Sequence, residues 1–106
     1  MMNSMVEEKI NAMLEAIAQG YANAIRDWKA DKKNPFKDGR MLAYYEAKET
    51  LMKYLDAEAP LKEAFEEINR RYNTAKSEWL ADKKNTFKDG KFLGYFEVLK
   101  VLPAGA

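Results

Sequence analysis

The chain has 106 residues, of which 47% are hydrophobic and 33% charged, and its formal net charge is +1. These values are typical of one soluble globular domain, so we expect residues 1–106 to form a single domain. The chain contains no cysteine and no histidine. Disulfides, thiolate catalysis and metal sites built on either residue are therefore excluded, and the commonest general base is missing. We expect a protein that is not an enzyme, with no metal and no cofactor.

Targeting signals give a similarly simple expectation. No apolar run approaches the roughly 18 residues that a membrane span needs. The opening residues, MMNSMVEEKI, have neither the basic segment nor the apolar segment of a secretory signal. We therefore expect no membrane partner and a cytoplasmic location.

The first quarter of the chain has the periodicity of an amphipathic helix. Its apolar residues recur every three or four positions, at Val6, Ile10, Met13, Ile17, Tyr21, Ala24 and Trp28. Ser4 and Glu7 have the spacing of a capping box, which predicts that the helix begins near Ser4.

A lysine-rich stretch, WKADKKNPFKDGR, follows from residue 28 to residue 40. Asn34 is suited to the left-handed conformation that ends many helices, and Pro35 cannot continue one. Asp38 is a good N-cap for a following helix, with the permissive Gly39 just after it. We interpret the stretch as a turn between two helices.

Beyond this turn, an apolar stripe at Met41, Tyr44, Ala47, Leu51 and Leu55 predicts a second, shorter helix. The chain then repeats itself. When it is shifted by 51 residues, residues 10–51 align with residues 61–102 without a gap, and 18 of the 42 pairs are identical. We place repeat one at about residues 5–57 and repeat two at about 60–102.

Two tandem helical hairpins joined by short loops predict an all-α fold. We expect a four-helix up-down bundle with pseudo-two-fold symmetry. In this topology the two lysine-rich turns, with Asn34 and Asn85 at their centres, lie at the same end of the molecule.

The charges would then be unevenly distributed. Residues 29–40 and 82–91 contain nine cationic and four acidic side chains, a net charge of +5, whereas residues 7–9 and 53–67 have a net charge of −4. Cations also favour helix ends without any ligand, so a structural explanation competes with a functional one. The candidate residues for binding an anion or a partner are Lys32, Lys33, Lys37, Arg40, Lys83, Lys84, Lys88 and Lys91.

Other chemistry is poorly supported. The turns fail the ligand pattern of a calcium-binding EF-hand, because Phe36 and Tyr45 fall where oxygen ligands are required. Glu46 and Glu97 recur in both copies, and we expect them to be solvated or ion-paired rather than metal ligands. The second and fourth helices are too apolar to enter a DNA groove, so sequence-specific DNA reading is not expected.

The last helix, KFLGYFEVLKVL, is apolar on almost every side. Such a helix packs centrally or covers a partner, and Gly94 would let a neighbouring helix approach closely. The candidate interface residues are Phe92, Phe96, Val98, Leu99 and Val101.

These features favour a non-catalytic protein-interaction or adaptor module that binds another protein or a second copy of itself as a homodimer. The alternative is an electrostatic binder of nucleic acid or another polyanion, which would use the basic end that carries both lysine-rich turns.

Overall fold

The computed structural model describes residues 4–103, and the side chains of residues 8–103. Four helices account for nearly all of this segment, and no strand occurs within it. The helices are α1 (Ser4–Ala30), α2 (Pro35–Asp56), α3 (Leu61–Ala81) and α4 (Thr86–Val101). The predicted all-α bundle of two tandem hairpins is confirmed. The proposed capping box of Ser4 and Glu7 lies outside the side chains that the structure describes.

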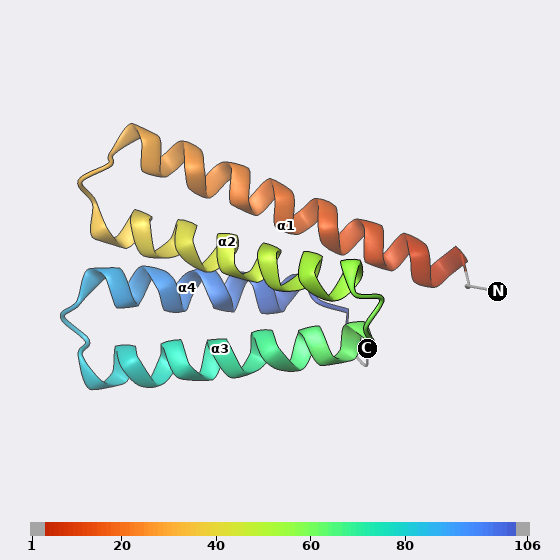
Figure 1. Ribbon diagram of the computed structural model, residues 1–106. Coiled ribbons are helices and arrows are strands. Elements are labelled where there is room, and N and C mark those ends of the chain that lie inside the picture. The colour runs from red at the N-terminus through yellow and green to blue at the C-terminus, as the bar shows by residue number, and fades with distance from the viewer. Residues whose placement is uncertain (1–3, 104–106) are drawn as a thin grey trace.

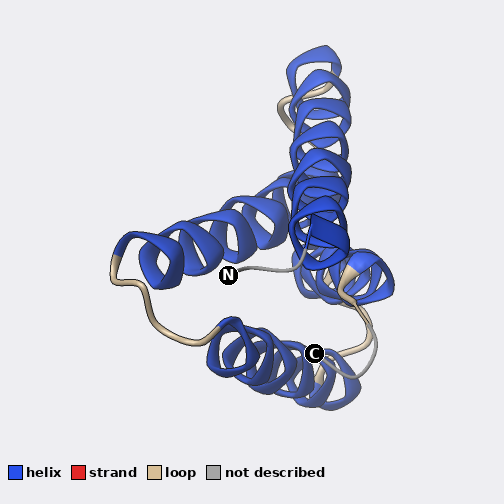
Figure 2. Cartoon of the chain, turned by 90° about the vertical axis from the view of Figure 1, so that its right-hand side faces the viewer, coloured by secondary structure: helices blue, strands red, loops and turns tan. Residues whose placement is uncertain are grey.

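The two hairpins pack through their second helices. α2 and α4 run side by side in the same direction in the middle of the molecule, with α1 and α3 outside them (Figure 1). α1 and α3 do not touch over the described residues. The result is an elongated, flattened bundle measuring 49 × 29 × 21 Å. Figure 2 views it from the end at which α1 begins and α2 turns into α3.

Glycines permit the close approach of α2 and α4. A Cβ atom at Gly39 would overlap the backbone carbonyl oxygen of Phe87, and one at Gly90 would overlap that of Phe36. Further along, a Cβ atom at Gly94 would lie 2.6 Å from the Cβ of Ala43, its counterpart in the first repeat. The expected role of Gly94 in helix approach is thereby confirmed. Gly39 lies inside α2 and serves packing, not the turn.

The prediction of how α2 begins was wrong. Asn34 does not adopt a left-handed conformation: its φ is −86°, and it is the N-cap of α2. Its side-chain oxygen accepts hydrogen bonds from the backbone N–H groups of Phe36 at 3.0 Å and Lys37 at 3.4 Å. Pro35 occupies the first position of the helix, where a missing N–H costs nothing. Asp38 therefore lies within the first turn.

The second lysine-rich turn is built in the same way. Asn85 is the N-cap of α4 and accepts a hydrogen bond of 3.1 Å from the N–H of Lys88. Because Asn caps a helix as well as Asp or Ser does, either assignment was compatible with the sequence. The cap was predicted four residues too late because Asp38 and Asn34 are both good capping residues.

A different motif ends α2. The N–H of Ala59 bonds to the carbonyl of Tyr54 at 3.0 Å, and the N–H of Glu58 bonds to that of Leu55 at 3.1 Å. This is the Schellman arrangement, and it places Glu58 in the left-handed region with φ 54°. Pro60 is the N-cap residue of α3.

The core follows the predicted apolar stripes. Its largest fully buried side chains are Ile17, Leu51, Ile68, Tyr95 and Val98. α4 contacts all three other helices, so the central packing that its all-round apolarity suggested is confirmed. The buried core holds the two hairpins in a fixed relation and so determines which side chains meet between them.

Candidate functional site

The two lysine-rich turns lie at the same end of the molecule, as the up-down topology requires (Figure 1). We call this end, which carries both lysine-rich turns, the loop end. The eight candidate cations lie in this one region of the fold, but their contacts and exposure differ. Arg40 and Lys91 turn toward the helix interface, and their side chains are 20% and 27% exposed. They are occupied with contacts inside the protein.

Most of the remaining candidates have contacts within their own turns. Lys37 pairs with Asp31 at 3.8 Å, and Lys88 pairs with Asp82 at 3.5 Å. Lys33 is exposed. Lys84, its counterpart in the second turn, is exposed as well, and these two are the candidates best placed to meet an external anion.

Two further lysines lie against tryptophans. The Nζ atom of Lys32 is 5.4 Å from the centre of the Trp28 ring, and that of Lys83 is 5.5 Å from the Trp79 ring. Cation–π contacts of this kind hold the ammonium group over the ring without removing it from water.

The residues that the repeats share form reciprocal hydrogen bonds between the hairpins. The Tyr44 hydroxyl donates to Glu97 at 3.0 Å, and the Tyr95 hydroxyl donates to Glu46 at 2.6 Å. Tyr95 is the copy-two counterpart of Tyr44, and Glu97 is that of Glu46. Each hairpin therefore gives the other the same tyrosine and the same glutamate, as in a symmetric dimer interface.

Cations complete this arrangement. Arg40 donates to Glu97 at 2.8 Å and also pairs with Asp27 at 3.3 Å. Lys91, the counterpart of Arg40, lies 3.7 Å from Glu46. Both glutamates are ion-paired, which is one of the two states expected for them. The sequence did not reveal the partners, although identical polar residues beside the apolar stripes of both copies were a usable signal.

Burial and these glutamates perturb both tyrosines. Burial, followed by the negative charge of Glu97, raises the pKa of Tyr44 to about 12. Burial and the hydrogen bond to Glu46 raise the pKa of Tyr95 as well. Both hydroxyls consequently remain protonated at neutral pH and act as hydrogen-bond donors.

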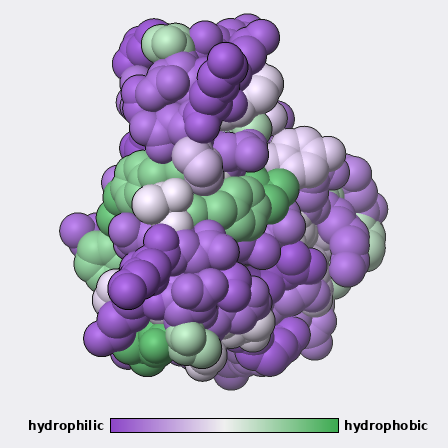
Figure 3. Space-filling model, turned by 90° about the vertical axis from the view of Figure 1, so that its left-hand side faces the viewer, coloured by the Kyte–Doolittle hydropathy of each residue, from purple (hydrophilic) through white to green (hydrophobic). Residues whose placement is uncertain are grey.

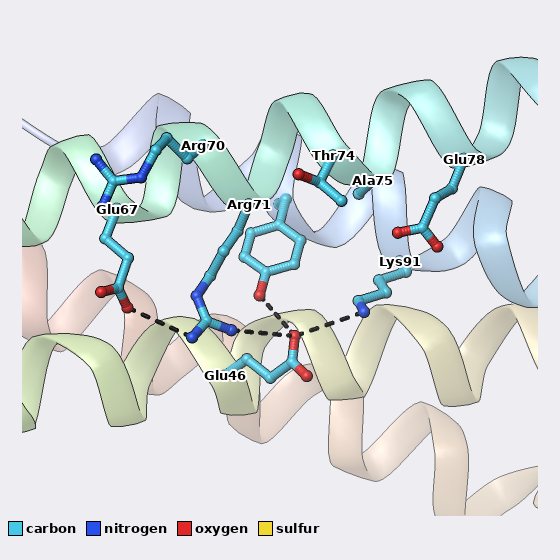
Figure 4. A pocket seen from close by; sticks show the side chains of 9 residues that line it. Glu46, Glu67, Arg70, Arg71, Thr74, Ala75, Glu78 and Lys91 are labelled. Atoms are coloured by element: carbon cyan, nitrogen blue, oxygen red, sulfur yellow. Dashed lines mark hydrogen bonds and ion pairs between the residues drawn. The ribbon is translucent and has the colours of Figure 1, made fainter.

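One of the two equivalent regions opens into a polar crevice between α2, α3 and α4, with a volume of about 390 Å³ (Figure 4). Arg71 reaches across it toward Glu46, at 3.9 Å, and pairs with Glu67 at 3.4 Å. The crevice is lined by Glu46, Glu67, Arg70, Arg71, Thr74, Ala75, Glu78, Lys91 and Tyr95.

The counterpart of Arg71 in the first repeat is Gly20. A Cβ atom at Gly20 would collide with the ring of Tyr44, so α1 lies directly against that tyrosine. At this position the first hairpin therefore packs α1 directly on the tyrosine, whereas Arg71 spans the crevice of the second. The charges of Glu46, Glu67, Arg71 and Lys91 are already paired with one another.

A second depression, the aromatic groove, has a volume of about 460 Å³ and is largely apolar. Two of its lining residues, Phe36 and Asp89, belong to the first turns of α2 and α4, which begin at the loop end. At this end a band of apolar side chains crosses the surface between hydrophilic regions (Figure 3). The groove is lined by Phe36, Tyr72, Asp89, Phe92, Leu93 and Phe96.

Stacked rings build the floor of this groove. Phe92 stacks on Trp79 with ring centres 5.0 Å apart, and it also lies 5.5 Å from Tyr72. Phe96 extends the row, 6.5 Å from Tyr72, and is 39% exposed. Aromatic groups held in this way offer a rigid apolar surface.

The structure separates the candidate interface residues. Phe92 and Phe96 line the groove, and Val101 is 36% exposed. Leu99 is partly buried against the core. Val98 is completely buried within the chain, so it contributes to the core and is inaccessible to a partner.

Comparison with protein-family models, with curated proteins and with solved structures finds no match. Within residues 4–103, no helix is both long and apolar enough to cross a membrane. The same described segment contains no cluster of three or more acidic side chains placed to hold a metal ion.

Proposed function

We propose that this protein is a non-catalytic interaction module, or adaptor, that docks another protein in the aromatic groove. The support is the groove itself: a rigid row of aromatic rings, partly exposed at Phe96, next to the start of two helices. Exposed aromatic residues in a shallow depression are typical of the energetically dominant centre of protein interfaces. We further propose that the protein acts in the cytoplasm.

The polar crevice is a weaker candidate for function, and we do not propose catalysis there. Glu46 already accepts a hydrogen bond from Tyr95 and lies near two cations. Tyr95 is fully buried and its pKa is raised, so its hydroxyl stays protonated at neutral pH and cannot accept a proton from a substrate. The arrangement is better explained as the connection between the hairpins.

A second copy of the chain is one form that the partner could take. Phe96 and Val101 are both exposed on α4, and a homodimer would cover them. Sedimentation of the wild type and of Val101→Lys tests this version of the proposal. A wild-type dimer that the substitution dissociates supports self-association. A monomer in both samples means that the partner is a different protein.

The alternative is a polyanion binder that uses the loop end. Exposed Lys33 and Lys84 favour it, while the internal pairing of Arg40 and Lys91 counts against it. Binding of single- or double-stranded nucleic acid that weakens steeply with salt, and that Lys33→Glu with Lys84→Glu abolishes, would favour this alternative. We expect no such binding near physiological salt.

Site-specific photo-crosslinking in cells tests the main proposal. A photoreactive phenylalanine analogue is placed at position 96, and in a matched variant at position 45, its counterpart in the first repeat. Tyr45 is 47% exposed and Phe96 is 39% exposed, so both positions are accessible. A protein adduct of defined mass at position 96, absent at position 45, supports the proposal. Equal labelling at both positions, or none at either, contradicts it.

A further inference from the structure

The duplication provides an internal comparison for the aromatic groove. The first-repeat counterparts of Phe92 and Phe96 are Met41 and Tyr45. Since the two repeats fold in the same way, the fold accepts a thioether at one of these positions and a phenolic hydroxyl at the other. The greater aromatic and apolar character of the second repeat at this surface is therefore not a general requirement of the hairpin fold.

The charges near the aromatic rings of the second repeat also differ from those near the rings of the first repeat. The row of rings in the second repeat runs from Trp79, stacked on Phe92, to Phe96. The Nζ atom of Lys83 lies 5.5 Å from the centre of the Trp79 ring, and that of Lys100 lies 4.5 Å from the Phe96 ring. The row thus carries an ammonium group at each end, and both lysines are exposed.

The first repeat shares part of this arrangement: the Nζ atom of Lys48 lies 5.3 Å from the centre of the Tyr21 ring, which is 6.2 Å from that of Tyr45. Lys32 lies over Trp28 at 5.4 Å, as Lys83 does over its own tryptophan. At the position equivalent to Lys100, however, the first repeat has Glu49. A lysine over the ring at position 96 is therefore a property of the second repeat, and it coincides with the additional aromatic residues.

We propose that the aromatic groove binds an acidic amphipathic helix of another protein, with apolar side chains on the rings and carboxylates near Lys83 and Lys100. This inference rests on the proposed docking function and specifies the partner. Helices commonly dock by laying an apolar face into such a groove. Carboxylates beside that face would meet the two ammonium groups, while a basic helix would be repelled.

The lining places a further requirement on the partner. Asp89 is the acidic residue among those that line the groove. A carboxylate directed into the groove would face this aspartate, so the buried face of the partner must be apolar. Its acidic residues belong on the flanks of the helix.

The test uses the full chain in a Trp28→Phe background, so that emission reports Trp79, which stacks on the groove residue Phe92. Three synthetic peptides of about four helical turns are titrated. The first carries a leucine face flanked by glutamates, and the second carries the same face flanked by lysines. The third is a scrambled form of the first, without an apolar face. Dissociation constants come from the emission change and from calorimetry.

We expect the acidic amphipathic peptide to bind at least about tenfold more tightly than the basic one, because like charges at an interface are unfavourable. The scrambled peptide should not bind. Lys100→Glu, a change at an exposed position, should weaken the acidic peptide and strengthen the basic one. The triple variant Phe92→Met, Phe96→Tyr, Lys100→Glu, which gives the groove the residues of the first repeat, should abolish binding.

The reverse variant, Met41→Phe, Tyr45→Phe, Glu49→Lys, is the matched control and should leave binding at the second-repeat groove unchanged. Equal binding of acidic and basic peptides would overturn the charge preference while leaving the docking function intact. No binding by any peptide, or binding that survives the triple variant, would overturn the inference itself. The photo-crosslinking result decides the docking function separately.

Discussion

The Tyr44 hydroxyl hydrogen-bonds to Glu97 at 3.0 Å, linking residues 53 positions apart and belonging to different hairpins. The equivalent hydrogen bond in the other direction runs from the Tyr95 hydroxyl of the second hairpin to Glu46 of the first. Polar residues that are identical in the two repeats are therefore used to join them. The duplicated sequence acts as both halves of one symmetric interface within a single chain.

These tyrosines predict a loss of stability at alkaline pH. The pKa of Tyr44 is about 12 in the folded protein, against an ordinary value of 10.0. Between these values the folded state keeps a proton that the unfolded state has lost, so the stabilisation present below pH 10 is lost as pH rises through about 12. Urea unfolding of the wild type and of Tyr44→Phe with Tyr95→Phe, from pH 8 to pH 12, measures this.

We expect the double variant to lose less stability than the wild type over this interval, by about 1 kcal/mol after solvent screening is allowed for. Lysine deprotonation affects both proteins equally and so cancels in the difference. Parallel pH profiles for the two proteins would contradict the prediction.

The close contact of α2 and α4 predicts an unusual effect of alanine. Replacing a helical glycine by alanine normally stabilises a helix by roughly 1 kcal/mol. Gly90→Ala should instead destabilise the protein by about 2 kcal/mol or more, because the new methyl group would overlap the carbonyl of Phe36. Gly39→Ala should behave alike. Both are measured by the free energy of unfolding in urea.

A paired substitution serves as the control for this packing argument. Gly94→Ala should destabilise the protein because it places a methyl group against Ala43. Adding Ala43→Gly should restore part of the loss, since it removes the clash between the two methyl groups but leaves the new one 2.8 Å from the carbonyl oxygen of Arg40. A double variant no better than Gly94→Ala would show that the contact does not limit the approach of the helices.

The asparagine caps give a third prediction. Asn34→Ala and Asn85→Ala should each lower the free energy of unfolding by about 1 kcal/mol, because backbone N–H groups at the helix start lose their acceptor. Asp38→Ala should have a smaller effect, since Asp38 lies within the first turn and is not the cap. A larger loss for Asp38→Ala would favour the capping assignment that the sequence first suggested.

A fourth prediction concerns the turn between the two hairpins. Glu58 has a φ of 54°, a conformation that costs a non-glycine residue roughly 1 kcal/mol. Glu58→Gly should therefore raise the melting temperature, and Glu58→Ala, which lacks the same freedom, should not. If the two variants shift the melting temperature equally, the effect comes from the charge of Glu58 and not from its backbone.

The sequence by itself determined the helices, their pairing into hairpins and the shared end of the two lysine-rich turns. Apolar periodicity and a constant offset between repeats can both be read along the chain, and they need no knowledge of which residues contact one another in space. The sequence also correctly indicated that Gly94 allows close packing and that α4 packs centrally. Asn34 was misassigned because several residues near a helix start can cap it.

Only the tertiary structure decided which side chains are accessible. Val98 and Phe96 lie two positions apart on the same apolar helix, yet one is completely buried and the other 39% exposed. Arg40 and Lys33 are both cations of one turn, but Arg40 is held by Glu97 from the other hairpin. Burial and pairing depend on neighbours brought together by packing, and a pattern along the chain does not contain them.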